Sequence, residues 1–95
     1  MIARLIYCKV APDQIKEAID DWKKVCAPIM ISQPGCLSEE LLACNEAPDE
    51  FISLSNWENM EAIQAYRTSK AHEQVKHSTR GIKADVVVKT YQVVG

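Results

Sequence analysis

Residues 55–82 read SNWENMEAIQAYRTSKAHEQVKHSTRGI, and this stretch decides the predicted fold. It contains one of the two tryptophans, both histidines, and a tyrosine and an arginine between them. Asn59 is suited to cap a helix from Met60, because its side chain can accept a hydrogen bond from a free backbone N–H. Ser69 is suited to cap a second helix, and Gly81 to end it. The stretch therefore predicts a strand end, then a helix pair held over a small cavity.

The rest of the chain supplies the strands of a sheet. The nearly continuous apolar run 2–10 predicts a central strand. Residues 36–44 are ambiguous, because their glutamates and leucines favour a helix by propensity. Turn residues on both sides favour a strand there, paired with the alternating segment 51–57. The β-branched segment 85–94 predicts the last strand.

One long amphipathic helix is predicted between the first two strands. Apolar residues recur at intervals of three and four from Ile15 to Ile29. Trp22 belongs to this apolar stripe, so we expect it to pack in the core. Pro28 is expected to kink the last turn or to end the regular helix near Ala27, because proline removes one helical hydrogen bond.

The predicted order is strand, helix, strand, strand, helix pair, strand. This order indicates a ferredoxin-like βαββαβ domain of the α+β class, with an antiparallel sheet and helices on one face. The length indicates that residues 1–95 form a single domain. Apolar residues on the other face of the sheet need a second cover. A homodimer that packs two sheets face to face supplies it, so we expect the chain to bind itself.

Composition argues against several other classes of protein. The net charge is −2, and the 11 basic and 13 acidic residues are scattered, so we expect neither nucleic acid nor anionic lipid as a partner. No apolar run approaches the ~20 residues of a membrane span. Met1 leads directly into a strand pattern, so we expect no signal peptide and a cytoplasmic protein. The four cysteines form no CxxC pair and are expected to be small buried side chains in a reducing compartment.

Two segments resemble the antibiotic biosynthesis monooxygenase family, namely PGCLSEELL at 34–42 and APDEFISLSNWENMEAIQAYRTSKAHEQV at 47–75. The family shows a Pro-Gly before its second strand, a tryptophan closing the third, and a Ser-x-x-His step opening the next helix. The matching positions here are Pro34-Gly35, Trp57 and Ser69–His72. The resemblance implies a dimeric α/β barrel with one pocket per subunit between the sheet and the helix pair. The family includes cofactor-free oxygenases of polycyclic phenols, haem-degrading enzymes, a signal-molecule isomerase and members without known activity.

The chain departs from the family at several positions. The haem-binding histidine of the haem-degrading members aligns near Lys76, and His77 is one step further on, which is a turn of ~100° on a helix. Their first-strand asparagine falls near Ile6 and is missing, so both departures argue against haem degradation. Ser55 stands where the family often has a glutamate. Ser53 stands where polyketide oxygenases have an asparagine that helps to hold the substrate. Its hydroxyl can donate one hydrogen bond, but it cannot replace both the donor and the acceptor of an amide.

His72 is the candidate catalytic residue. A neutral imidazole is favoured at the positive end of a helix, and it can exchange a proton with a phenol at neutral pH. The structural alternative is a histidine that only bonds a backbone group, and Trp57 has the alternative of closing the barrel end. The candidate substrate-binding residues are Trp57, Tyr66, Ser53, Arg67 and His77.

Two functions stay open. The first is a cofactor-independent monooxygenase acting on a small aromatic or quinol-type molecule, in which the substrate anion reduces oxygen without a metal or flavin. The second is a non-catalytic dimer that binds a small ligand or acts in a stress response. No metal site is expected, because only two histidines are present and the cysteines lie in different elements.

Overall fold

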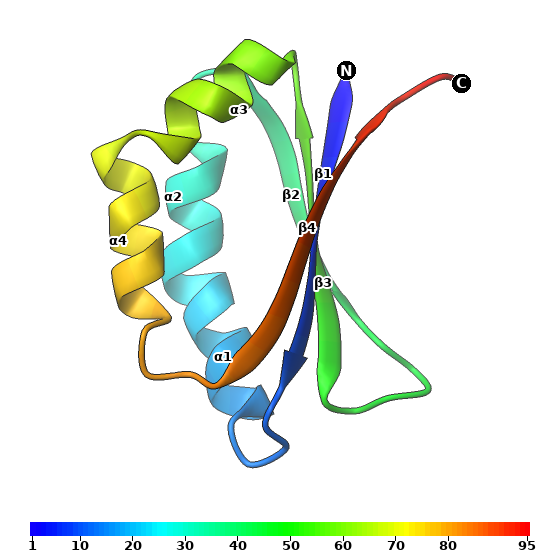
Figure 1. The fold of residues 1–95 in the computed structure, drawn as a ribbon, viewed down its shortest axis with the longest axis vertical. Coiled ribbons are helices and arrows are strands. Elements are labelled where there is room, and N and C mark those ends of the chain that lie inside the picture. Colours follow the sequence, from blue (N-terminus) through cyan, green and yellow to red (C-terminus); the bar gives the residue numbers. More distant parts are fainter.

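A four-stranded antiparallel sheet carries all the helices on one of its faces, as predicted (Figure 1). The computed structural model describes residues 1–95. The strands are β1 (Ile2–Val10), β2 (Cys36–Ala43), β3 (Glu50–Trp57) and β4 (Ala84–Gln92). The helices are α1 (Ile15–Asp21), the π-helical η1 (Trp22–Cys26), α2 (Ala27–Ile31), α3 (Met60–Arg67) and α4 (Lys70–Ser78). The ambiguous segment 36–44 is therefore a strand.

The sheet order is β2-β3-β1-β4, so the apolar run of β1 is an inner strand, as predicted. Ile6 pairs with Ser53 of β3 on one side and with Val88 of β4 on the other. Because side chains alternate along strands, these three residues share the face that the helices cover. Every second residue of β1 and of β3 is buried on this face. β4 is different, since all nine of its residues are exposed.

The core fills the space between the sheet and the helices. Its most deeply buried large side chains are Trp57, Met30, Ile63 and Cys26, which are at most 2% exposed. Trp22 is also buried, as expected from its apolar stripe. All four cysteines are free thiols, two of them buried and two half-buried.

The long helix continues through Pro28, so the expectation that regular helix ends near Ala27 is wrong. α1, η1 and α2 follow one another without a break to Ile31. The backbone N–H of Ala27 bonds the carbonyl of Trp22, five residues earlier, in the π-helical segment that precedes the proline. A proline ring clashes with the carbonyl four residues before it in an α-helix, and a π-helical turn changes that spacing. The wider turn therefore accommodates Pro28.

The helix pair begins at the two predicted caps. Asn59 Oδ1 accepts a hydrogen bond from the Ala62 N–H at 2.9 Å, and Ser69 Oγ accepts one from the His72 N–H at 3.2 Å. The expected stop at Gly81 is wrong, because α4 ends at Ser78. The Ser78 hydroxyl donates to Asp21 Oδ1 at 2.5 Å, which ties α4 to the first long helix.

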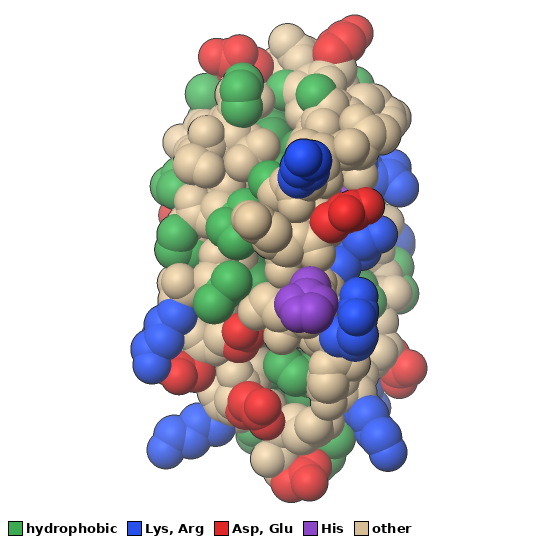
Figure 2. Space-filling model, turned by 90° about the vertical axis from the view of Figure 1, so that its left-hand side faces the viewer, with side chains coloured by type: hydrophobic (Ala, Val, Ile, Leu, Met, Phe, Trp, Pro, Cys, Tyr) green, Lys and Arg blue, Asp and Glu red, His purple; other side chains and the backbone are tan.

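The outer surface of the helix layer is polar and mixed in charge. Acidic and basic side chains alternate there with scattered hydrophobic ones (Figure 2). This pattern is that of a solvated helix face. No helix of the chain is long and apolar enough to cross a membrane.

Candidate active site

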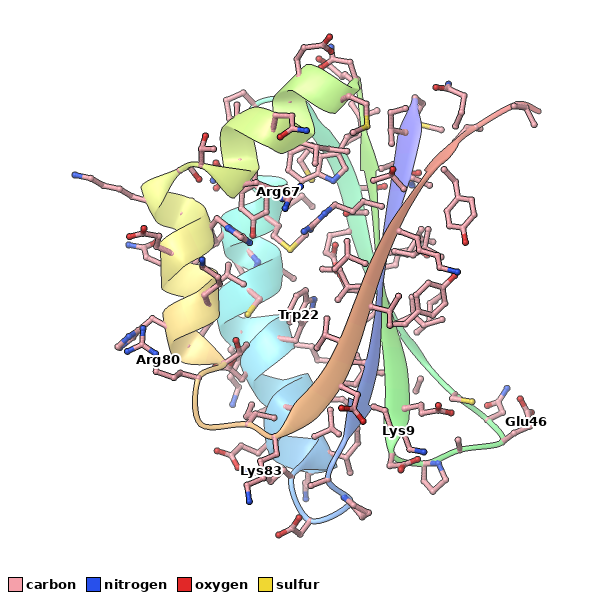
Figure 3. All side chains as sticks on the ribbon, viewed as in Figure 1. Lys9, Trp22, Glu46, Arg67, Arg80 and Lys83 are labelled. Carbon is pink, nitrogen blue, oxygen red and sulfur yellow. The ribbon has the colours of Figure 1, made fainter.

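A cavity of about 250 Å³ lies between the covered face of the sheet and the helices. Ile6 and Cys8 of β1 form part of its floor, together with Val86 and Val88 of the edge strand β4. Trp22 reaches from the long helix toward the sheet and forms part of the opposite wall (Figure 3). Because β4 is exposed along its whole length, the cavity lies near the open edge of the sheet. Its walls are mostly apolar, and the polar exceptions are Arg4, His72 and Thr79.

Arg4 is a charged residue on the buried face of an inner strand. It is only 5% exposed, and its Nε has no hydrogen-bond partner. It forms no ion pair, because the only salt bridge of the chain joins Lys24 and Asp20. Burial lowers the pKa of the guanidinium, and the positive charge of Arg67 lowers it further, while Tyr66 and Glu39 oppose the effect. Sequence reasoning missed Arg4 as a site residue. The usable signal was its position two residues before Ile6, which places a charged side chain on the same face of the strand as apolar ones.

His72 projects into the cavity from the first turn of α4. Its Nδ1 lies 3.0 Å from the carbonyl oxygen of Arg67. A carbonyl can only accept a hydrogen bond, so Nδ1 carries the proton and Nε2 of the neutral ring keeps a free lone pair. Burial lowers the pKa of His72; the Arg67 carbonyl opposes this, and the positive charges of Lys76, Arg4 and Arg67 add to it. The imidazole is therefore a neutral base at pH 7.

An aromatic stack supports His72 from behind. The rings of Trp57 and Tyr66 are stacked, with centroids 5.4 Å apart. The imidazole of His72 packs against Tyr66 in an edge-to-face arrangement, with ring centroids 5.0 Å apart. Trp57 is fully buried and donates from Nε1 to Ser55 Oγ at 2.9 Å. Tyr66 is 2% exposed, and burial raises the pKa of its phenol to about 12. In this structure both rings lie in the core, so they act on the cavity through the position of His72.

Ser53 belongs to a buried polar cluster with Glu39. Its hydroxyl donates to Glu39 Oε1 at 2.8 Å, and the indole N–H of Trp22 donates to the same oxygen at 3.1 Å. Glu39 Oε2 is buried without a partner. Burial raises the pKa of this carboxyl, although the two hydrogen bonds and the charge of Arg4 act in the opposite direction. Sequence reasoning also missed Glu39, which had served only as an argument about helix propensity.

Arg67 and His77 have different positions relative to the cavity. Arg67 is exposed and lines a neighbouring hollow of about 400 Å³ that shares Arg4, His72 and Val88 with the first cavity. His77 is exposed on α4 and lines neither of the two. The structure therefore brings His72 and Arg67 together with Arg4, and leaves His77 apart.

The cysteines do not form a reactive or metal-binding centre. Burial raises the pKa of the Cys8 thiol to about 11 and that of Cys26 to about 12, so both stay protonated at neutral pH. No three histidine, cysteine, aspartate or glutamate side chains converge. The charged and titratable groups that can serve a ligand in the cavity are therefore Arg4 and His72.

Ferredoxin-like domains with a cavity between sheet and helices have many different functions. Comparison with known proteins identifies the family within this fold class. The family model described as antibiotic biosynthesis monooxygenase matches residues 1–78. The chain belongs to this family. Among curated proteins, none matches the sequence.

Solved structures share the fold at low sequence identity. A Deinococcus radiodurans protein named after the antibiotic biosynthesis monooxygenases is 14% identical, with a TM-score of 0.87 over 100% of this chain and 94% of its own. A Bordetella bronchiseptica protein of the same designation is 18% identical, with a TM-score of 0.87 over 98% and 96%. SnoaB, a cofactor-independent oxygenase from Streptomyces nogalater, is 11% identical, with a TM-score of 0.81 over 99% and 93%. At these identities the likeness shows a common fold.

Proposed function

We propose that this chain is a cofactor-independent monooxygenase that oxidises a small aromatic, quinol-type molecule in the cavity between the sheet and the helices. The observation that carries the proposal is the orientation of His72. Its Nδ1–H is held by the Arg67 carbonyl at 3.0 Å, which leaves Nε2 as a base beside an apolar cavity. An apolar cavity with few polar groups is the usual form of a site for a planar organic substrate.

The proposed reaction begins with a proton transfer. Nε2 of His72 takes the phenolic proton of the substrate, and the positive charge of Arg4 stabilises the anion that forms. The electron-rich ring then reduces molecular oxygen and forms a carbon–oxygen bond at the ring carbon opposite the phenolate. A peroxide results, its O–O bond breaks, and the proton held by His72 returns to the departing oxygen.

The two atoms of molecular oxygen end in different products. The ring carbon loses one hydrogen and the phenolic oxygen loses the other, and the ring carbon gains one oxygen atom as a carbonyl. The second oxygen atom leaves with the two hydrogens as water. The substrate supplies all four electrons, so the chemistry requires no flavin or metal. We propose that a layer of buried residues next to the cavity fixes its shape, namely Ser53, Tyr66 and Trp57. We propose that Arg67 stabilises negative charge at the entrance. His77, the remaining candidate from the sequence, lies outside both hollows and is given no part in the proposed reaction.

The test is oxygen uptake with a panel of one- to three-ring quinols and phenols, compared with protein-free solution. General-base catalysis contributes on the order of 10²–10⁴ in rate, so His72→Ala should lose about 100-fold or more of the enzymatic rate. His77→Ala is the matched control from the same helix and should keep the wild-type rate. With ¹⁸O₂, one labelled atom should enter the product, whereas a simple quinol oxidase would leave the product unlabelled.

Two outcomes would contradict the proposal. Equal rates for the wild type and His72→Ala would remove His72 from the mechanism. No uptake above background for any compound, together with ligand binding, would favour the non-catalytic binding dimer instead. The homodimer itself is proposed from the uncovered face of the sheet, and the four free cysteines are compatible with a reducing compartment such as the cytoplasm.

A further inference from the structure

Arg4 is a buried cation without a counter-charge of its own. A guanidinium that is 5% exposed, with an unpartnered Nε and no ion pair, costs folding free energy. The only close stabilising contact is the ring of Tyr66, whose centroid lies 5.9 Å from Cζ. Because the position lies on the covered face of an inner strand, an apolar residue would fit the pattern of its neighbours. This cost therefore needs a reason outside the folded chain itself.

Glu39 does not supply the missing negative charge. Its Oε1 is occupied by the hydrogen bonds from Trp22 and Ser53, and it forms no ion pair with Arg4. Burial raises the pKa of the carboxyl, while the two hydrogen bonds and the charge of Arg4 lower it, and its other oxygen, Oε2, makes no hydrogen bond. The chain thus leaves the guanidinium open to an anion from outside.

The surroundings of Arg4 are cationic, although the whole chain has a net charge of −2. Arg4 and His72 line both the apolar cavity and the neighbouring hollow, and Arg67 stands at the latter. Positive charges that converge on one concave region attract anionic ligands and disfavour cationic ones. The apolar cavity holds about 250 Å³, slightly below the roughly 300–1,000 Å³ of common ligand sites, so it suits one or two rings.

We propose that the ligand of this site is a one- or two-ring aromatic molecule that carries a carboxylate, which pairs with Arg4 while the ring lies against the apolar walls. The proposal rests on the cavity assigned above to the monooxygenase and names its substrate class. A carboxylate is the anion that matches the planar fork of a guanidinium with two parallel hydrogen bonds. The ring then lies beside Nε2 of His72, since both residues line the same cavity.

The test uses two ligands of equal shape, 1-naphthoate and the neutral 1-naphthamide, with calorimetry at fixed ionic strength. The wild type should bind naphthoate about ten- to a hundredfold more tightly than the amide, as expected for hydrogen bonds to a charged group. Arg4→Met should lose this preference and still bind the amide. Arg4→Lys should keep part of it. The control is Arg80→Met, because Arg80 is exposed and projects away from the sheet (Figure 3).

Three results would overturn the proposal. The first is equal binding of both ligands by the wild type. The second is a preference for naphthoate that survives in Arg4→Met, and the third is no binding of either compound at millimolar concentration. Thermal unfolding separates a ligand-binding role from a structural one. Arg4→Met should have a Tm equal to or above that of the wild type, because it removes a buried unpaired charge. A lower Tm together with an unchanged ligand preference in Arg4→Met would assign Arg4 to folding.

Binding and turnover are read separately. If the protein prefers naphthoate through Arg4 but consumes no oxygen, the proposed anion site stands and the proposed monooxygenase activity is contradicted. If the protein oxidises neutral quinols through His72 but shows no preference for the carboxylate, the proposed monooxygenase activity stands and the proposed anion site is contradicted.

Discussion

The orientation of a single imidazole depends on two backbone features of the helix pair. Ser69 caps α4 and accepts from the backbone N–H of His72, so the residue sits in the first helical turn. The carbonyl of Arg67, at the end of α3, then lies 3.0 Å from Nδ1. The turn between the two helices therefore sets both the direction of the ring and its tautomer, without a carboxylate partner.

The lowered pKa of His72 predicts how stability depends on pH. Because its folded-state pKa lies below the ordinary 6.5, the unfolded chain binds more protons as the solution is acidified. The stability that neutral His72 contributes is fully present above about pH 6.5 and is lost as the pH falls through the folded-state pKa. Urea midpoints of the wild type should therefore fall more steeply between pH 7 and pH 5 than those of His72→Gln.

The control for this measurement is His77→Gln. His77 is exposed on the same helix, so its replacement should leave the steepness of the pH dependence near that of the wild type. Parallel pH profiles for the wild type and His72→Gln would contradict the assigned environment of the ring.

At the scale of elements, the connection between α2 and β2 holds the helix pair over the sheet. Gly35 has a positive φ of 85°, and its carbonyl accepts a hydrogen bond from the N–H of Glu58, just after β3. A Cβ added to Gly35 would lie 2.5 Å from Cβ of Ala62 in α3. The Pro34-Gly35 step is thus needed both for the turn and for the close approach of α3.

Gly35→Ala should be clearly destabilising. The left-handed backbone costs a residue with a Cβ roughly 1–2 kcal/mol, and the contact with Ala62 adds an overpacking cost of about 1–3 kcal/mol. Chemical denaturation should show a loss of about 2–5 kcal/mol in the free energy of unfolding. Gly81→Ala is the matched control, because Gly81 has no positive φ and nothing within 4 Å of an added Cβ. Similar losses for both variants would show that the conformation at Gly35 is not the cause.

The π-helical segment is the other element that positions the site. It lets the long helix pass Pro28 and still bury Trp22, Cys26 and Met30 on one side. Trp22 then reaches both the cavity and Glu39 Oε1. A π-helical turn inside an α-helix is frequent at functional sites, which agrees with the position of this one beside the cavity.

At the scale of the whole molecule, the sheet has one uncovered face (Figure 1). The register places an apolar set of residues on it. These residues are Leu5, Tyr7, Leu42, Ile52, Leu54, Val87 and Tyr91. Antiparallel sheets commonly face water on one side, but with polar residues there. An apolar face of this size is typical of a surface that a partner covers.

The homodimer is therefore tested at this face. The wild type should have twice the chain mass by light scattering coupled to gel filtration, and Val87→Glu should have the mass of one chain, because the dimer would bury an unpaired charge. Ile31→Glu is the control: Ile31 is as exposed as Val87, 53% in both, but lies at the end of α2 in the helix layer. A monomeric wild type, or a dimer that tolerates Val87→Glu, would contradict this prediction.

The sequence alone determined the order of elements, the two helix caps and the pairing of β2 with β3, because capping, turn chemistry and hydrophobic period are local properties. It also identified the family, through short motifs around Trp57 and Ser69. It left open whether Pro28 would kink the helix or end it near Ala27, and it did not foresee the π-helical turn before the proline, because such a turn has no simple sequence pattern.

Only the tertiary structure decided which polar groups meet. Arg4 comes from β1 and His72 from α4, so no spacing along the chain predicts that they line one cavity. The same packing left Trp57 and Tyr66 behind His72 instead of at the cavity wall. The side chains that meet in a cavity are fixed by strand register and helix placement, and both depend on contacts between residues far apart in sequence.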